Sequence, residues 1–408
     1  MTVRLFKHFE PMTPRSHPDL RLTYSMNVHS GDSFMDQWSA AKYCAVKVRE
    51  SITPECGNFG LGLRLSNQAV EEALGGNLLS DFSKWCHDEG FHVFTINGFP
   101  FGNFHEPPVK SRVYRPDWTG VDRVYYTRKL FDALSRLPND RTYGSVSTVP
   151  LFYRPDYQGL EETNTAIAIC VKHLIEMAEY LEALSEKSER DLVLALEPEP
   201  WCCLESSGDV VDFYETHLLP AAGGQKEPLI RKRIGVCIDT CHCALAYECP
   251  AEVISKLKGK GIRIAKIQIS AAPAFSNEPA WLSKMQDFVD PVYLHQTAAM
   301  VNGRIHRWQD LNQAISDLSL MNNWHDARVH YHVPLHWPGS GDVATTRNVM
   351  NTSFWLTVNG SGCEHLEIET YTFNILPAPL KQESLVNSLV GEYRWVLESL
   401  SNSIPPNG

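Results

Sequence analysis

The sequence predicts an α/β fold in which eight parallel strands close into a (β/α)8, or TIM, barrel with extended loops at its C-terminal face. Three observations predict it. The chain of 408 residues is 43% hydrophobic, enough for one large core. Short apolar or β-branched runs recur along it, and helix-like segments follow most of them. No internal repeat, low-complexity tract or long linker divides the sequence, so we expect one elaborated domain over residues 1–408.

Nine runs are candidate strands. They are LTYSMNVHS from Leu22, FGLGLRLS from Phe59, HVFTINGFP from His92, YGSVSTVPL from Tyr143, LVLALEPEP from Leu192, IGVCIDTCH from Ile234, RIAKIQISA from Arg263, RVHYHVPLHW from Arg328 and HLEIETYTF from His365. A barrel takes eight strands, here over about residues 22–371. One run, most simply RVHYHVPLHW, is therefore an addition to the barrel or a competitor for its seventh position.

Helices and long loops account for the rest of the chain. Apolar residues recur three and four apart over 163–185, which predicts a helix outside the sheet, and a C-terminal helix is expected at about 380–400. A barrel needs roughly 250 residues. Two excursions, 99–118 and 271–327, leave strands at their C-terminal ends, where barrel enzymes build their sites. They are lids over a pocket, or else an oligomer interface or a cap.

Charge and composition limit the classes of molecule that the protein is expected to bind. A formal net charge of −11 disfavours nucleic acid and anionic membranes, which usually meet a concentrated basic face. No run of 18 apolar residues and no signal-peptide core is present. The eleven cysteines show no paired CxxC spacing. We therefore expect a cytoplasmic protein with reduced thiols that binds a small-molecule metabolite and does not insert into a membrane.

Acidic residues follow two of the strands at the point where the apolar run stops. In LVLALEPEP the run ends at Glu197, and the prolines after it mark the end of regular pairing. In IGVCIDTCH it ends at Asp239, and His242 comes three residues later, where a turn would swing it over the same mouth. We expect the thiols of this segment to be packing; a soft-metal CxC site at Cys241 and Cys243 is the weaker alternative.

Two later runs add further ligand types. Period two places His330 and His332 on one face, and Glu367 and Glu369 on another. Buried acids on adjacent inward faces repel one another unless a cation holds them, so a divalent ion is expected, with Mn²⁺, Zn²⁺, Mg²⁺ and Fe²⁺ all compatible. The predicted metal ligands are Glu197, Asp239, His330, His332 and Glu369, and the predicted catalytic residues are Glu197, Glu369 and His242.

Four more inward polar residues, Arg64, Asn97, Lys266 and Gln268, are candidates to bind the substrate. Each has a structural alternative. Arg64 and Lys266 could instead form buried ion pairs with Glu197 and Glu369, which would remove the need for a metal. Asn97 could merely shape the turn at Gly98.

The arrangement of LALEP, CIDTCH and LEIE resembles the xylose-isomerase-like barrel superfamily, which contains sugar isomerases, epimerases and metal-dependent apurinic endonucleases. The resemblance implies a divalent ion held by a Glu on strand five, an Asp on strand six followed by His, a His on strand seven and a Glu on strand eight. The matching positions are Glu197, Asp239 with His242, and Glu369 or Glu367. The seventh strand departs from this pattern, since KIQIS has Gln268 and only His330 or His332 could substitute.

A second resemblance covers nearly the whole chain. The segments LTYSMNVHSGD, GLGLRLS, VFTINGFPFGNFH, VKSRVYRPDW, GSVSTVPL, LALEPEP, VYLHQ, VHYHVPLHW and HLEIETYTF are similar to the metabolite traffic protein EboE family. That family is encoded in clusters that make or move a secondary metabolite. The resemblance implies the same barrel and partner proteins from the same biosynthetic cluster.

Three functions are compatible with these residues. The first is a metal-dependent isomerase or epimerase acting on a sugar, polyol or cyclitol, with Glu197 or Glu369 moving a proton. The second is a non-catalytic carrier or scaffold in metabolite handling, which the missing histidine of the seventh strand favours. The third is metal-assisted phosphoester cleavage of the apurinic-endonuclease type, which the negative charge disfavours.

Overall fold

The computed structural model describes residues 19–52, 59–103, 105, 109–140, 142–378, 380–381 and 383–403. Residues 104 and 106–108 of the first predicted excursion lie outside this range. The main sheet has eight strands, all parallel, in the order β1-β15-β9-β8-β7-β6-β5-β3. A parallel bridge between Ser25 and Gly62 brings the chain after β1 beside the β3 segment, where Met26 N donates to Gly62 O at 2.8 Å. The predicted barrel is therefore confirmed.

The eight barrel strands fall on eight of the nine predicted runs. They are β1 (Arg21–Tyr24), β3 (Leu63–Arg64), β5 (Thr95–Asn97), β6 (Gly144–Thr148), β7 (Leu192–Leu196), β8 (Ile234–Asp239), β9 (Ile264–Ile269) and β15 (His365–Ile368). Two short strands, β2 (Phe59–Gly60) and β4 (Phe91–His92), pair in parallel just before β3 and β5. The seventh barrel position belongs to β9.

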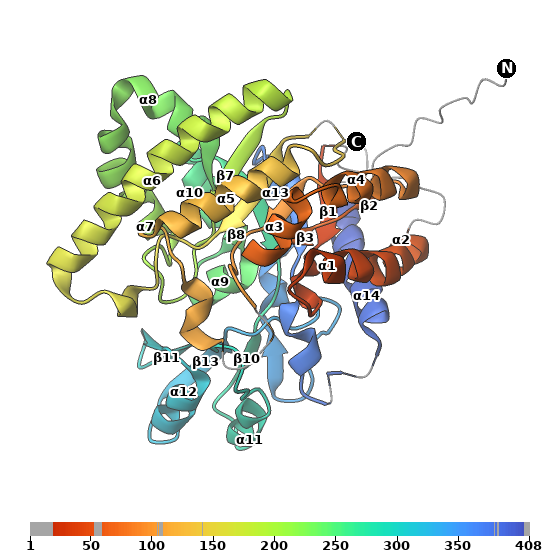
Figure 1. The fold of residues 1–408 in the computed structure, drawn as a ribbon. Coiled ribbons are helices and arrows are strands. Elements are labelled where there is room, and N and C mark those ends of the chain that lie inside the picture. The colour runs from red at the N-terminus through yellow and green to blue at the C-terminus, as the bar shows by residue number, and fades with distance from the viewer. Residues whose placement is uncertain are drawn as a thin grey trace, which may run out of the picture.

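Helices surround the ring (Figure 1). They are α1 (Phe34–Ala40), α2 (Val46–Ile52), α3 (Asn67–Leu74), α4 (Leu78–Glu89), α5 (Val121–Leu134), α6 (Gly159–Ser188), α7 (Ser207–Asp212), α8 (Leu219–Arg233), α9 (Thr240–Leu245), α10 (Pro250–Gly259), α13 (Thr352–Asn359) and α14 (Leu385–Asn402). The predicted helix over 163–185 lies within α6, and the predicted C-terminal helix is α14. In the part of the chain described here, every helix is too short or too polar to cross a membrane.

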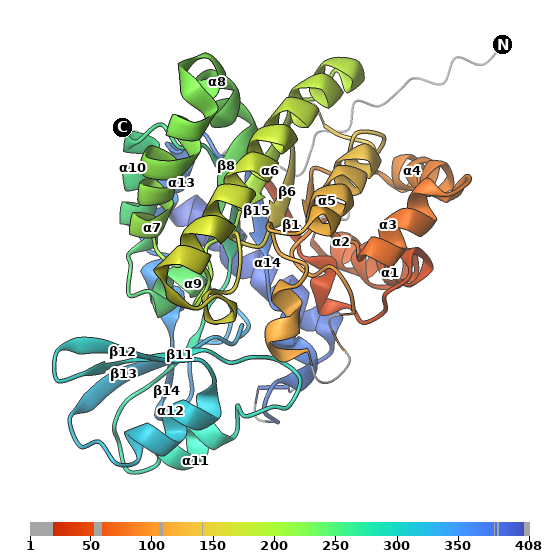
Figure 2. The same ribbon diagram turned by 60° about the vertical axis from the view of Figure 1, so that its left-hand side comes forward.

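An insertion after β9 forms a second, antiparallel sheet in the order β12-β11-β13-β10-β14. Its elements are β10 (Pro273–Phe275), α11 (Trp281–Gln286), β11 (Thr297–Val301), β12 (Arg304–Trp308), α12 (Leu311–Leu318), β13 (Trp324–Val329) and β14 (Val343–Thr345). In both ribbon views this sheet and its two helices project from one end of the barrel (Figures 1 and 2). The second predicted excursion is thus larger than expected.

The prediction of a strand over the whole run RVHYHVPLHW was wrong beyond Val329. Of this run, only Arg328 and Val329 are part of a strand, as the last two residues of β13. That strand pairs with β10 and β11 and is an addition to the barrel. After β13 the chain leaves the antiparallel sheet and returns toward the barrel. His330 N donates to Gln296 O, before β11, at 2.7 Å, and Val333 N donates to Ala271 O, after β9, at 2.9 Å. Pro334 then has no N–H with which to continue a ladder.

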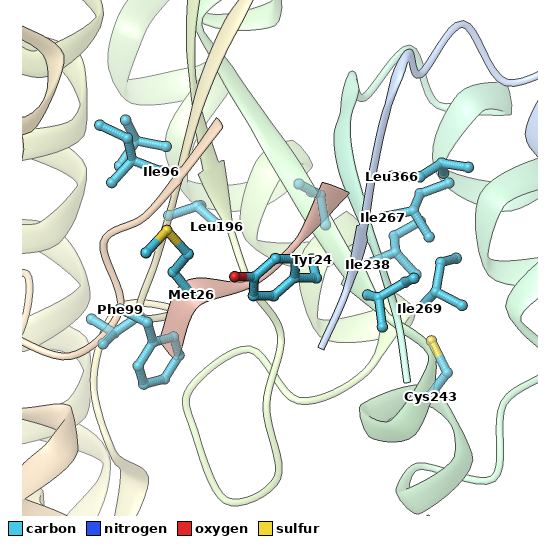
Figure 3. Packing of buried hydrophobic residues seen from close by; sticks show 14 of the residues in the cluster. Tyr24, Met26, Ile96, Phe99, Leu196, Ile238, Cys243, Ile267, Ile269 and Leu366 are labelled. Carbon is cyan, nitrogen blue, oxygen red and sulfur yellow. The ribbon is translucent and has the colours of Figure 1, made fainter. Parts of the chain in front are cut away.

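Alternate side chains of the barrel strands enter two different environments. One set joins the core between the sheet and the helices; Figure 3 shows Ile238, Ile267, Ile269 and Leu366 from β8, β9 and β15 in one group. The other set points into the ring and is largely polar. Lys266 Nζ, for example, reaches across to Glu367 Oε2 at 2.5 Å. The predicted period of two therefore decides which residues reach the interior.

One buried carboxyl links the C-terminal helix to two segments near the barrel mouth. Glu392 Oε1, on α14, accepts hydrogen bonds from Leu335 N at 3.1 Å and from Thr370 Oγ1 at 2.5 Å. Leu335 lies three residues after His332, and Thr370 directly follows Glu369. Glu392 therefore holds together the two segments that carry predicted metal ligands.

Stability should depend on the protonation of this carboxyl. Burial raises the pKa of Glu392 to about 7, although the hydrogen bonds from Thr370 and Leu335 oppose the shift. Because the folded protein holds this proton more tightly than the unfolded chain does, the contribution to stability is complete below the unfolded pKa and is lost as pH rises through about 7. We expect Glu392→Gln, which keeps the accepting oxygen, to lose less stability than the wild type between pH 5 and 9, by up to about 3 kcal/mol.

Urea denaturation at several pH values measures this difference. Glu398→Gln, an exposed carboxyl on the same helix, is the control and should follow the wild type. Parallel pH profiles for Glu392→Gln and the wild type would contradict the prediction.

Candidate metal centre

The three predicted carboxylates lie at the C-terminal ends of barrel strands. Glu197 follows β7, Asp239 ends β8, and Glu369 follows β15. They are 3%, 1% and 4% exposed, so water does little to stabilise their charges. Asp239 also caps helix α9: its Oδ1 accepts from Cys241 N at 2.7 Å and His242 N at 3.0 Å. This cap fixes the orientation of the carboxyl through Oδ1 and leaves Oδ2 outside the cap.

Three amides hold one oxygen of Glu369. Its Oε1 accepts from Asn27 Nδ2 at 2.7 Å, Asn97 Nδ2 at 3.0 Å and Gln268 Nε2 at 2.9 Å. Asn97 and Gln268, predicted to bind the substrate, are therefore committed to a carboxylate through their amide nitrogens. The Glu369 and Asp239 carboxyls also contact each other, which is stable only if a proton or a cation lies between them.

Three ligand atoms in this region lack a partner among the described residues. Glu197 Oε2, Asp239 Oδ2 and His332 Nε2 are buried and form no hydrogen bond. Unsatisfied buried groups of this kind are costly, and a cation would satisfy all three types. The residues present therefore fit a bound divalent ion.

The histidines lie beside the carboxylates. One ligand atom each from Glu197, Asp239 and His242 lies within 4.8 Å of the other two, and the same holds for His242, His330 and His332. Asp239, Cys241 and His332 form a further such group, so a cysteine predicted to be packing lies against the site. The structure thus brings the predicted ligands together, although His330 and His332 arrive from an irregular segment and not from a strand.

The pKa values reflect crowded negative charge. Burial raises the pKa of Glu197 to about 8, reinforced by Asp239 and Glu199 and opposed by His242 and Lys266. Burial and the charges of Glu197 and Asp239 raise the pKa of Glu369 well above its usual value. Without a cation, burial and the neighbouring charges thus favour the protonated forms of Glu197 and Glu369 over their charged forms.

The two histidines after β13 are available as ligands. Burial lowers the pKa of His330 well below its usual value and that of His332 to about 4, even though Asp239 raises the latter. Both rings are therefore neutral at pH 7, and a neutral imidazole offers one nitrogen lone pair to a metal.

The alternative that barrel cations neutralise the site does not fit the contacts. Lys266 pairs with Glu367, both fully buried, which leaves Glu369 as the strand-eight candidate for a metal ligand. Arg64 pairs with Asp32 at 3.1 Å and also donates to Gly102 O. Neither Lys266 nor Arg64 lines the cavity that Glu197, His242 and Glu369 help to form. The geometry therefore gives no support to their predicted substrate contacts.

A cavity opens onto two of the three carboxylates, Glu197 and Glu369. Its empty volume, including the part open to solvent, is about 520 Å³. The lining residues include the site residues Asn27, Asn97, Glu197, Glu199, His242, His330 and Glu369, and the loop residues Phe99, Lys110, Tyr114, Tyr293 and Tyr371. Both predicted excursions therefore wall the cavity.

Two of the polar residues beside the carboxylates, Asn27 and Glu199, were not predicted as site residues from the sequence. Asn27 continues the inward alternation of Thr23 and Ser25 beyond the end of β1, a signal that could have found it. Glu199 shares a strand face with Glu197 and accepts from Tyr114 Oη at 2.7 Å, so the second glutamate of EPEP also reaches the cavity.

Comparison with known proteins supports the fold. No protein-family model and no curated protein matches the sequence. A xylose isomerase-like TIM barrel protein from Mycobacterium smegmatis, solved in complex with magnesium, is 11% identical; the match covers 95% of this chain and 98% of that one, with a TM-score of 0.51. At this identity the likeness shows the fold alone, which is the xylose isomerase-like TIM barrel.

Two other solved structures match at slightly lower TM-scores. A xylose isomerase domain protein from Alicyclobacillus acidocaldarius is 11% identical over 94% of this chain and 99% of its own, with a TM-score of 0.49. A D-tagatose 3-epimerase-like protein is 12% identical over 94% of this chain and 98% of its own, with a TM-score of 0.48.

Metal binding should release protons. Glu197, with its pKa at about 8, must lose its proton to coordinate an ion. The apparent affinity should therefore rise with pH between 6 and 8, by up to about tenfold per pH unit for each proton displaced. Calorimetric Mn²⁺ titrations in buffers of different ionisation enthalpy count these protons.

We expect about one proton released at pH 7, from Glu197, and fewer at pH 9. Glu197→Gln, which has no proton to give up at this position, should release about one fewer than the wild type. Binding with no proton release at pH 7 would show that the carboxyls are already ionised in the metal-free protein.

Proposed function

We propose that the protein is a metal-dependent isomerase or epimerase that acts on a sugar or cyclitol. The observation that carries this proposal is the grouping of Glu197, Asp239 and His242, with unsatisfied oxygens on both acids, behind a cavity whose wall includes Glu197, His242 and Glu369. Glu197, Asp239 and Glu369 would hold the ion, and their oxygens suit Mg²⁺ or Mn²⁺. When bound, the ion would polarise a carbonyl and its neighbouring hydroxyl.

The chain's own groups would move the proton. A carboxylate of Glu197 or Glu369 takes the proton from the carbon beside the carbonyl, and a carboxylic acid returns it to the other face or to the neighbouring carbon. A carboxylate placed beside the reacting carbon can act as the general base, and burial in the metal-free site raises the pKa of Glu197 to about 8, so this group holds a proton more tightly than an exposed carboxyl does. The amides of Asn27, Asn97 and Gln268 fix the orientation of Glu369.

The cavity lining favours an uncharged polyol over a phosphoester. Lys110 is the one lysine or arginine among the described lining residues, and its Nζ is already paired with Asp310 at 2.7 Å. Asparagine, tyrosine and carboxylate groups supply donors and acceptors for hydroxyls. Cleavage of a nucleic-acid backbone would require a basic surface that this lining does not provide.

The biological setting follows from the family resemblance. Similarity of segments such as LALEPEP and HLEIETYTF to the EboE family supports a substrate from secondary-metabolite biosynthesis or traffic, handled in the cytoplasm with partner proteins from the same cluster. In this setting, a carrier that binds the same metabolite without turnover is the alternative that the following tests distinguish.

Glu197→Gln should abolish turnover. The amide cannot accept the substrate proton, so we expect kcat to fall by about 10²-fold to 10⁴-fold on a panel of ketoses, aldoses and inosose-type cyclitols. Proton exchange from deuterated solvent into the substrate, followed by NMR, provides the measurement. Glu186→Gln, an exposed carboxyl on α6, is the control and should keep full activity.

Two results would contradict this assignment. Full activity in Glu197→Gln would remove this carboxyl from the mechanism. Stoichiometric metabolite binding by the wild type, without any exchange or turnover across the panel, would favour the carrier.

Asp239→Ala should lose the divalent ion that the carboxylates of Glu197, Asp239 and Glu369 are proposed to hold. This variant removes a ligand and leaves Glu197 and Glu369 without the neighbour that helps to bind the cation, so Mn²⁺ affinity should fall at least about 10²-fold. Electron paramagnetic resonance of free Mn²⁺ measures the bound fraction. Asp212→Ala, an exposed acid on α7, should bind one equivalent as the wild type does; an unchanged affinity in Asp239→Ala would sink the carboxylate site.

A further inference from the structure

A further carboxyl, Glu199, lines the cavity beside the metal centre but belongs to none of its ligand groups. Its side chain is 6% exposed. Among the described residues, the groups that could share an ion include Glu197 but not Glu199. Prolines 198 and 200 flank it, and Glu199 N donates to Leu204 O at 3.1 Å, so the backbone that carries it is fixed. The carboxyl therefore needs an explanation apart from the ion.

One oxygen of Glu199 is held by the loops over the barrel. Its Oε1 accepts a hydrogen bond from Tyr114 Oη at 2.7 Å. Tyr114 is itself fixed, because its ring stacks on Tyr153 with the centroids 4.6 Å apart and its Oη accepts from Gln296 Nε2 at 2.7 Å. Tyr114 comes from the first excursion and Gln296 from the insertion after β9. The orientation of the carboxyl is therefore set before any ligand enters.

The other oxygen of Glu199, Oε2, accepts no hydrogen bond from the described residues. It differs from Glu197 Oε2, which also has no partner but is enclosed by protein atoms. Because Glu199 lines the cavity and its Oε2 is not enclosed, a ligand in the cavity can reach this oxygen. A fixed polar group of this kind, at the wall of a partly apolar cavity, sets the orientation and identity of a ligand.

No lysine or arginine of the described residues forms an ion pair with Glu199. His330 Nδ1 lies 4.0 Å from its Oε1, but gives its hydrogen to Gln296 Oε1 at 2.7 Å. Lys110, the one lysine or arginine of the described lining, is held by Asp310. The proposed ion does not balance Glu199 either, since the three carboxylates that would hold it already carry more negative charge than a divalent cation supplies.

Several hydrogen-bond donors of the cavity lining are committed to protein groups. Asn27 and Asn97 direct their amide nitrogens at Glu369, and Tyr114 donates its hydroxyl hydrogen to Glu199. The free acceptor is Glu199 Oε2. A ligand therefore gains most at this point by bringing donors of its own, and an ammonium group has three donors and no acceptor.

We propose that the polyol substrate carries an amino group and that Glu199 Oε2 binds its ammonium form. The proposal rests on the proposed function only in taking this cavity as the substrate site. Within the polyols that the lining favours, the member with one positive charge is the one that leaves this enclosed carboxylate paired when the ligand displaces water. Hydrogen bonds between two charged groups are also roughly twice as strong as those between neutral ones.

The substrate class is therefore an amino sugar or an aminocyclitol. Its hydroxyls would face the ion, and its ammonium would meet Glu199. Glu199 determines specificity in this arrangement and takes no part in proton transfer, so Glu197 and Glu369 keep the roles proposed above.

Matched ligands test the proposal on the full-length wild-type protein loaded with Mg²⁺. The probes are deoxyamino hexoses with the amino group at different carbons and a deoxyamino inositol, each beside its hydroxyl parent and its N-acetyl derivative. Calorimetry at pH 7 measures their binding. We expect the best amino compound to bind at least about 10-fold more tightly than its parent and its uncharged N-acetyl derivative. Equal binding within every set, or no binding by any amino compound, would overturn the proposal.

Glu199→Gln separates charge from shape, because the amide keeps an oxygen for Tyr114. This variant should lose about 10-fold or more in affinity for the best amino compound and stay within about twofold of the wild type for the hydroxyl parent. Glu205→Gln is the matched control: it removes the same charge from a carboxyl that follows the same strand, pairs with Arg307 at 3.3 Å and does not line the cavity. A preference for the amino compound that survives in Glu199→Gln would contradict the assignment.

Circular dichroism checks that both variants fold, and if Glu199→Gln does not, the matched ligands on the wild type still decide. The outcome is separate from that of the proposed function. Selective binding of amino compounds without turnover of any of them would overturn the isomerase and leave the role of Glu199 standing. Turnover of hydroxyl compounds without any preference for their amino counterparts would do the reverse.

Discussion

Concentrated negative charge at the barrel mouth is the constraint on which the rest of the site depends. Four glutamates and one aspartate end up buried in or next to one ring, because the strands that carry them are parallel and finish at the same edge. Lys266 balances Glu367, and among the described residues no other lysine or arginine forms an ion pair with the remaining acids of the ring. Burying an unpaired carboxylate costs several kcal/mol. The fold therefore tolerates Glu197, Asp239 and Glu369 together only with protons or a cation.

The local pattern of the sequence is enough to predict the barrel and this triad. Each barrel strand is an apolar run of period two, and each acid stands where its run stops, as Glu197 does after Leu196 and Asp239 does at the end of β8. Those signals are local, because side-chain alternation and the loss of ladder pairing at a proline are set by neighbouring residues. The position of Glu369 over Glu367 follows from the same alternation.

The partners of these residues could not be predicted in this way. Glu367 pairs with Lys266, and one oxygen of Glu369 accepts hydrogen bonds from Asn27, Asn97 and Gln268. These contacts join strands that lie far apart in the sequence, so the local pattern does not predict them. His330 and His332 lie beside His242 although their segment is not a strand, so the strand periodicity that predicted a shared face does not explain their position. Their position depends on where the insertion docks, which no local period encodes.

The departure at the seventh strand has a physical consequence. Gln268 stands where the family resemblance implies a histidine, and it serves Glu369 through its amide. The imidazole nearest that carboxyl is His332, anchored by its Nδ1 on Glu369 O and by Thr372 Oγ1 on its own carbonyl at 2.5 Å. Two of the nitrogen ligands, His330 and His332, thus come from the segment that follows the insertion, whereas His242 and the oxygen ligands come from the barrel. An ion that binds both would add a link between two parts of the chain that already share the apolar core, so its binding free energy would also stabilise their docking.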